Sequence, residues 1–157
     1  MKIHFVCTGN IYRSRLAEAY LRSKQIPNLL VSSSGTRSSI QLKGPITWYA
    51  QRILQRNMLT TFMSYSWKDT EYQVLRDSDY VIFMSKENYE FCKSKNYPMG
   101  NKHLVWELPD FDEISLSGKS LDKKVEIKII GDSEETFINI KKKVDQLVQD
   151  LQLSDNR

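Results

Sequence analysis

Short apolar runs alternate with stretches of helical spacing along this chain, and that alternation is what most limits its fold. Residues 2–6, 29–32, 79–84 and 102–106 have the composition of buried strands, and the segments between them show helical periodicity. Strands separated by helices favour a parallel sheet that is covered on both faces. We therefore expect an α/β chain with a single-domain, three-layer fold, in which a four-stranded parallel sheet is flanked by helices and the domain spans residues 1–157.

Three of the intervening segments predict helices. In residues 13–25 the apolar side chains recur at helical spacing, and Pro27 follows as a stop signal. Residues 45–57 begin with a proline, which suits a first helical turn, and residues 86–95 follow the third predicted strand.

Two capping-box patterns predict further helix starts. Residues 66–69 resemble a box that opens a short helix, and residues 132–135 resemble one that opens the last helix. Ahead of the second box, residues 125–130 read as extended. The last helix carries one apolar stripe, typical of a helix packed on a core, formed by Phe137, Ile140, Val144, Leu147, Val148 and Leu151.

The composition is that of a soluble globular protein. Of the 157 residues, 40% are apolar and 27% are charged, and no apolar run approaches the roughly 20 residues needed to cross a bilayer. Residues 1–6 are too short for a signal peptide, so a cytoplasmic location is expected. The net charge of +4 includes three lysines at 141–143 that read as a solvated helix face, so neither nucleic acid nor a membrane is expected as a partner.

The cysteines and histidines limit the covalent and metal chemistry. Two cysteines are too few for a disulfide framework, and Cys92 is expected to pack in the core from a helix. His4 and His103 are far apart in sequence and have no metal-ligand motif beside them, so no metal ion or organic cofactor is expected. Dinucleotide binding is disfavoured because the chain has no G-x-G-x-x-G turn.

The other cysteine, Cys7, ends the first predicted strand, and Arg13 begins the helix that follows. In open α/β sheets, ligands bind in the crevice at the carboxyl ends of the strands. Gly9 and Asn10 tolerate left-handed backbone angles, so the loop can turn its N–H groups inward as an anion nest beside a helix N-terminus. Arg13 adds a planar fork that matches two phosphate oxygens.

A cysteine in such positive surroundings is a competent nucleophile at neutral pH. The pattern therefore points to in-line attack of sulfur on a phosphate ester, which gives a cysteinyl-phosphate that water then hydrolyses. An alternative from another class is a module that uses the same cradle to bind a phosphopeptide without turnover.

Residues 6–19, VCTGNIYRSRLAEA, resemble the low-molecular-weight protein tyrosine phosphatases, whose signature is V-C-x-G-N-x-C-R-S-P followed by a helix that often reads x-A-E-A. Three further segments agree in order. Residues 31–36 are similar to the family's S-A-G-T segment, residues 78–84 to its D-x-I-x-x-M strand, and residues 108–110 to the start of its V-P-D-P acid loop. The resemblance implies a Rossmann-like fold of the phosphotyrosine phosphatase I type, and hydrolysis of phosphotyrosine in protein substrates.

The resemblance also implies a role for each residue of the loop. Cys7 would be the nucleophile, and Arg13 would clamp the phosphate oxygens. Ser14 would donate a hydrogen bond to the Cys7 thiolate, and Asn10 would adopt a left-handed conformation held by hydrogen bonds that include Ser33. The phosphate or another oxyanion would lie in a cradle of backbone N–H groups contributed by Thr8, Gly9, Asn10, Ile11, Tyr12 and Ser14.

Asp110 matches the acid of the V-P-D-P loop and would serve as general acid and then general base. It would protonate the leaving phenol and then activate the hydrolytic water. Asp112 is the alternative, and the order of the segments along the chain favours Asp110.

The sequence departs from the family pattern near the loop. Tyr12 replaces the family's second loop cysteine, so no local disulfide can form. Arg15 replaces a proline, and it either adds charge at the mouth of the pocket or faces solvent. Phe111 replaces the proline of the acid loop, and Ile40 stands where relatives often have an aromatic wall. Tyr12 and Phe111 could supply the apolar walls instead.

Two related activities use the same kind of loop. Arsenate reductases of this type relay electrons through two further cysteines, of which this chain has only Cys92. Protein arginine phosphatases typically carry threonine where this chain has Ile11, and isoleucine favours a tyrosine-type pocket.

Overall fold

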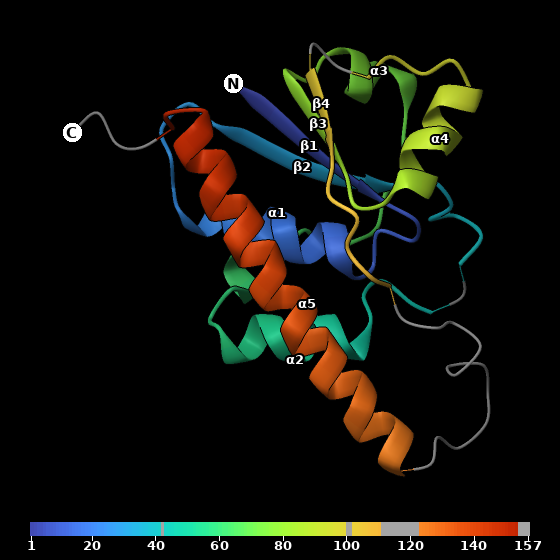
Figure 1. Cartoon of the computed structure of the whole chain (residues 1–157), viewed down its shortest axis with the longest axis vertical. Helices are drawn as coiled ribbons and strands as arrows, with labels where there is room; N and C mark the ends of the chain where they lie inside the picture. The colour runs from blue at the N-terminus through green and yellow to red at the C-terminus, as the bar shows by residue number, and fades with distance from the viewer. Residues whose placement is uncertain (42, 100–101, 111–122, 154–157) are drawn as a thin grey trace.

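The fold is built on a parallel sheet, which lies between two layers of helices in Figure 1. The computed structural model describes residues 1–41, 43–99, 102–110 and 123–153. Its four strands lie in the order β2-β1-β3-β4, and every neighbouring pair is parallel, as the sequence predicts. The strands are β1 (Lys2–Cys7), β2 (Leu30–Gly35), β3 (Tyr80–Phe83) and β4 (Lys102–Val105).

Helices cover both faces of the sheet and complete the expected three layers. One face is covered by α1, α2 and α5, and the other by α3 and α4 (Figure 1). The helices are α1 (Arg13–Ser23), α2 (Trp48–Arg56), α3 (Tyr72–Arg76), α4 (Lys86–Ser94) and α5 (Lys123–Asp150), with a 3₁₀ turn, η1, at Thr60–Phe62. No helix among the described residues is both long and apolar enough to span a membrane.

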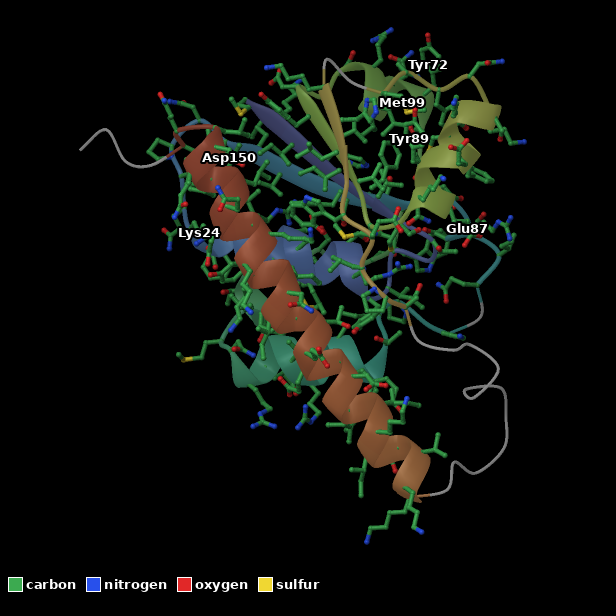
Figure 2. The ribbon with its side chains drawn as sticks, in the orientation of Figure 1. Lys24, Tyr72, Glu87, Tyr89, Met99 and Asp150 are labelled. Atoms are coloured by element: carbon green, nitrogen blue, oxygen red, sulfur yellow. The ribbon has the colours of Figure 1, made fainter. Side chains whose placement is uncertain are left out.

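The alternation of side chains along β1 divides the core between the two faces. Ile3, Phe5 and Cys7 belong to the larger apolar cluster beneath α1, α2 and α5. Val6 points to the opposite face and belongs to a smaller cluster that includes Cys92. Tyr89 and Met99, both labelled in Figure 2, pack against that smaller cluster. The Cys7 side chain thus packs against the larger core cluster and lies at the edge of the sheet where the strands end.

Cys92 lies in the core, as expected from the sequence. Its side chain is fully buried beside Leu75 and Phe83, and burial raises the pKa of its thiol to about 12. Cys92 therefore stays a neutral, space-filling thiol.

The capping box at 66–69 was a wrong prediction. The backbone there pairs with the end of β2 instead, because Lys68 O accepts from Gly35 N and Gly35 forms a parallel bridge with Asp69. The short helix α3 begins later, at Tyr72. A tertiary hydrogen-bonding partner has overridden the local signal.

The predictions at 125–130 and 132–135 were also wrong, because α5 begins at Lys123 and runs through both segments. Ile129 and Ser133 are buried in phase with the stripe that continues through Phe137, so helical packing prevails over the local alternation. The Ser133 hydroxyl donates to Ile130 O inside the helix and caps nothing. The apolar stripe from Phe137 to Leu151 packs against the core, as predicted.

The other predicted helices differ from the observed ones only at their ends. In α2, Thr47 is the N-cap, its hydroxyl accepts from Ala50 N at 3.2 Å, and Pro45 precedes the helix. Strand β2 continues three residues beyond the predicted end, to Gly35. That extension brings Ser33 and Gly35 against the loop after β1.

His4 provides a test of this fold through pH. Its ring nitrogens lie 2.7 Å from the hydroxyls of Ser32 and Ser34, and burial, assisted by the charge of Lys68, lowers its pKa to about 3. In the unfolded chain the His4 ring gains a proton as the pH falls below about 6.5, whereas in the folded chain it stays neutral until the pH approaches 3. The contribution of neutral His4 to folding stability is therefore complete above pH 6.5 and is lost as the pH falls toward 3.

We expect His4 to account for about 2 kcal/mol of stability lost between pH 7.5 and pH 5. Urea unfolding of wild type and His4→Gln at both pH values measures that difference. The control is His103→Gln, since His103 is exposed and should leave the pH dependence as in wild type. If wild type and His4→Gln lose the same stability between the two pH values, His4 is not the source of the pH dependence.

Candidate active site

The strand–loop–helix unit that starts the chain forms the floor of a cavity. Cys7 is the last residue of β1 and Arg13 is the first of α1, so the loop between them lies at the N-terminus of a helix. The cavity has a volume of about 220 Å³. It is lined by Cys7, Thr8, Gly9, Ile11, Tyr12, Arg13, Arg37, Ile40, Gln41, Lys43, Thr47 and Asp110.

The sulfur of Cys7 is surrounded by hydrogen-bonding groups. Asn10 N donates to Cys7 Sγ at 3.1 Å, and Ser14 Oγ lies 2.9 Å from the same sulfur. Ser14 Oγ also accepts from Asn10 Nδ2 at 2.9 Å, which leaves its own proton for the sulfur. Two hydrogen-bonding groups, Asn10 N–H and the Ser14 hydroxyl, are therefore directed at Cys7 Sγ.

Asn10 has the left-handed backbone expected from the sequence, with φ of 52°. Its side chain is fixed at both ends: Oδ1 accepts from Lys68 N, and Nδ2 donates to Ser33 Oγ as well as to Ser14, each at 2.9 Å. The predicted contact with Ser33 is therefore present. These bonds stabilise a conformation that a non-glycine residue rarely adopts.

A buried carboxylate sets the direction of this network. Ser33 Oγ donates to Glu18 Oε2 at 2.6 Å, and a carboxylate only accepts. Ser33 must then accept from Asn10 Nδ2. Glu18, which is 1% exposed, was not identified from the sequence, although it belongs to the A-E-A triplet quoted above.

Backbone hydrogen bonds from the residues just after β2 and just before α2 hold the loop in place. Thr36 N donates to Cys7 O, Arg37 N to Thr8 O and Thr47 N to Ile11 O, each at 2.9 Å. Gly35 lies so close to the loop that a Cβ there would stand 2.5 Å from Thr8 O and 2.7 Å from Asn10 N. Glycine is required by this close approach.

Arg13 links the loop to the segment after β4. Its guanidinium donates from Nη1 to Leu108 O at 2.9 Å and from Nη2 to Asp110 Oδ2. Arg13 is buried, and the Asp110 side chain is 37% exposed at the cavity wall. The structure thus brings the predicted nucleophile, arginine and acid to one cavity, although 95 residues separate Arg13 from Leu108. Asp112 and Phe111 lie outside the described residues.

The cavity walls combine apolar and cationic side chains. Tyr12 is 4% exposed and forms an apolar wall, as expected, together with Ile11 and Ile40. Burial raises the pKa of Tyr12 above its ordinary value, so the phenol stays neutral. Arg37 and Lys43 also line the cavity and were missed, because isolated cations in a loop carry no sequence signal of their own.

Neither position predicted for Arg15 is correct. Its side chain is fully buried beneath the loop, away from the pocket mouth and from solvent. Among the described residues, no group of three or more His, Cys, Asp or Glu side chains is arranged to hold a metal ion.

The chain is similar to known proteins in sequence and in fold. The family model described as low molecular weight phosphotyrosine protein phosphatase matches residues 2–156. No curated protein sequence matches the chain. Among solved structures, the phosphotyrosine phosphatase VcLMWPTP-2 of Vibrio cholerae O395 has 21% identity and a TM-score of 0.74, with 97% of each chain covered.

Two further structures have the same fold. The Drosophila arginine phosphatase DARP has 22% identity and a TM-score of 0.72, covering 99% of this chain and 100% of its own. Wzb of Vibrio vulnificus, solved with benzylphosphonate, has 18% identity and a TM-score of 0.72, covering 95% and 97%.

Fold and family match together define a phosphatase, a hydrolase of phosphoric monoesters. The chain belongs to the low molecular weight phosphotyrosine protein phosphatase family. Structures similar to it include both tyrosine and arginine phosphatases.

Proposed function

We propose that this protein hydrolyses phosphotyrosine in protein substrates through a cysteinyl-phosphate intermediate. The observation that carries the proposal is the convergence of Cys7, Arg13 and Asp110 on one cavity, with two hydrogen-bond donors directed at the Cys7 sulfur.

In the first step, Cys7 Sγ attacks phosphorus in line with the phenolic oxygen. The S–P bond forms as the P–O bond to the phenol breaks, and Asp110 gives its proton to the departing oxygen. Arg13 and the loop N–H groups hold the equatorial oxygens of the phosphoryl group.

In the second step, Asp110 takes a proton from water, whose oxygen attacks phosphorus and displaces the Cys7 thiolate. The products are inorganic phosphate and the free enzyme, with Asp110 again carrying the proton. Ser14 assists because its hydroxyl proton is directed at the sulfur, which leaves as an anion.

The lining of the cavity supports tyrosine over arginine as the side chain of the substrate. Ile11 and Tyr12 present apolar surface to a phenyl ring, while Arg37 and Lys43 are cations that disfavour the guanidinium of phosphoarginine. The same two cations suit a phosphotyrosine with acidic neighbours. For arsenate reduction, the second cysteine would have to be Cys92, which is fully buried in the core cluster on the other face of the sheet.

Hydrolysis of phosphotyrosine and phosphoarginine peptides by the wild-type protein, in EDTA, tests the proposal. Release of phosphate from phosphotyrosine with the higher kcat/KM is the expected result. A higher kcat/KM on the phosphoarginine peptide would instead identify the protein as an arginine phosphatase. Binding of phosphate or vanadate without turnover of either peptide would identify a phosphopeptide-binding module.

Exchange of one wall residue should shift the choice of substrate. We expect Ile11→Thr to raise the ratio of phosphoarginine to phosphotyrosine hydrolysis at least about tenfold, because a hydroxyl can bond the guanidinium and the phenyl ring loses apolar contact. Ile40→Thr, farther out on the wall and 70% exposed, is the matched control and should change the ratio little. Equal ratios in wild type and Ile11→Thr would remove Ile11 as a determinant of specificity.

A further inference from the structure

Arg15 is a fully buried cation beneath the loop, at the third position of α1. Its Nη1 donates to Asn10 O at 3.2 Å and to Pro45 O at 3.1 Å, and its Nη2 donates to Ser64 O. One guanidinium therefore joins three backbone carbonyls that are up to 54 residues apart in sequence.

The three carbonyls belong to segments with distinct places in the site. Asn10 is the left-handed residue of the loop, whose N–H donates to the Cys7 sulfur. Pro45 lies in the segment 43–47, which contributes Lys43 and Thr47 to the cavity wall. Ser64 follows η1, and its hydroxyl donates to Glu18 Oε1 at 2.6 Å. The Arg15 side chain thus spans the floor and one wall of the cavity from behind.

The buried charge of Arg15 has a partner. Burial lowers the pKa of its guanidinium, while Glu18 and the Cys7 sulfur act in the opposite direction. Glu18 Oε2 lies 3.9 Å from Arg15 Nε, and arginine remains protonated in proteins. A buried cation is expensive to desolvate, and here its fork points at carbonyls of the loop and the wall.

We propose that Arg15 is a positioning residue that couples the phosphate-binding loop to the wall segment 43–47, so that both are held in the geometry that binds the phosphoryl group. The inference rests on the proposed function, because it concerns the same cavity. Arg15 acts through Asn10 O and Pro45 O and does not line the cavity itself.

Inorganic phosphate is the probe for this role, measured as the Ki against p-nitrophenyl phosphate and as a direct Kd by calorimetry. We expect Arg15→Met to weaken phosphate binding about 10- to 100-fold, because loop and wall no longer share an anchor. Arg15→Lys keeps the charge but loses the planar fork, so it should recover only part of the affinity.

Arg22→Met is the matched control. Arg22 also pairs with Glu18, at 2.7 Å, and also bonds Ser64, but it bonds Val31 O in β2 instead of the loop. We expect this variant to lower the thermal midpoint while the Kd for phosphate stays within about twofold of wild type.

Three results would overturn the inference: unchanged phosphate binding in Arg15→Met, full recovery in Arg15→Lys, or equal weakening in Arg22→Met. If Arg15→Met does not fold, the Kd of Arg15→Lys decides, since unaltered affinity would again contradict the bridging role. A wild type that binds phosphate without hydrolysing phosphotyrosine would refute the proposed function, yet the comparison of Kd values would still test Arg15.

Discussion

Replacing Cys7 with serine should reduce hydrolysis of p-nitrophenyl phosphate by about 10⁴-fold or more, because a neutral serine hydroxyl is a far weaker nucleophile than a thiolate. The residue is placed to react: two hydrogen-bond donors converge on its sulfur, and the Arg13 guanidinium lines the same cavity. Serine fits the same volume, so the loop should keep its shape and still bind phosphate. The measurement is kcat/KM together with the Kd for phosphate.

The matched control is the other cysteine. Cys92→Ala removes a buried thiol from the cluster on the opposite face, so it should reduce stability and leave kcat/KM within about twofold of wild type. Retention of substantial activity in Cys7→Ser, or loss of activity in folded Cys92→Ala, would contradict the assignment of Cys7 as nucleophile.

The residues of the loop could be predicted from the sequence because their relations are local. Cys7, Asn10, Arg13 and Ser14 lie within one strand–loop–helix unit, whose geometry is fixed by a short connection. Asp110 was predictable from its place after the fourth strand, since the carboxyl ends of parallel strands share one edge.

The environment of Arg15 could not be predicted in the same way. An arginine in the first turn of a helix ordinarily faces solvent, and its burial here depends on carbonyls from residues 45 and 64. The capping-box patterns failed for a related reason. Ser133 sits in phase with a buried stripe, and residues 68 and 69 pair with β2, so tertiary contacts decide both cases.

Replacing Asp110 with asparagine should slow hydrolysis of phosphotyrosine by about 10²–10⁴-fold, as expected for loss of a general acid. Asparagine has nearly the same shape, so the wall of the cavity is retained. The effect should be smaller on p-nitrophenyl phosphate, because p-nitrophenolate leaves readily without a proton. The measurement is kcat for both substrates in wild type and Asp110→Asn. Glu107→Gln, an exposed carboxylate in the same segment that does not line the cavity, is the control.

The ion pair between Asp110 and Arg13 leads us to expect that Asp110→Asn lowers kcat without weakening phosphate binding. Asp110 Oδ2 accepts from the same guanidinium that the proposed mechanism assigns to the phosphoryl oxygens, so carboxylate and phosphate compete for Arg13. We therefore expect Asp110→Asn to bind phosphate at least as tightly as wild type while its kcat falls. If Asp110→Asn loses kcat and also binds phosphate more weakly, the role of Asp110 is to hold Arg13. If Asp112→Asn loses more kcat than Asp110→Asn, Asp112 is the general acid.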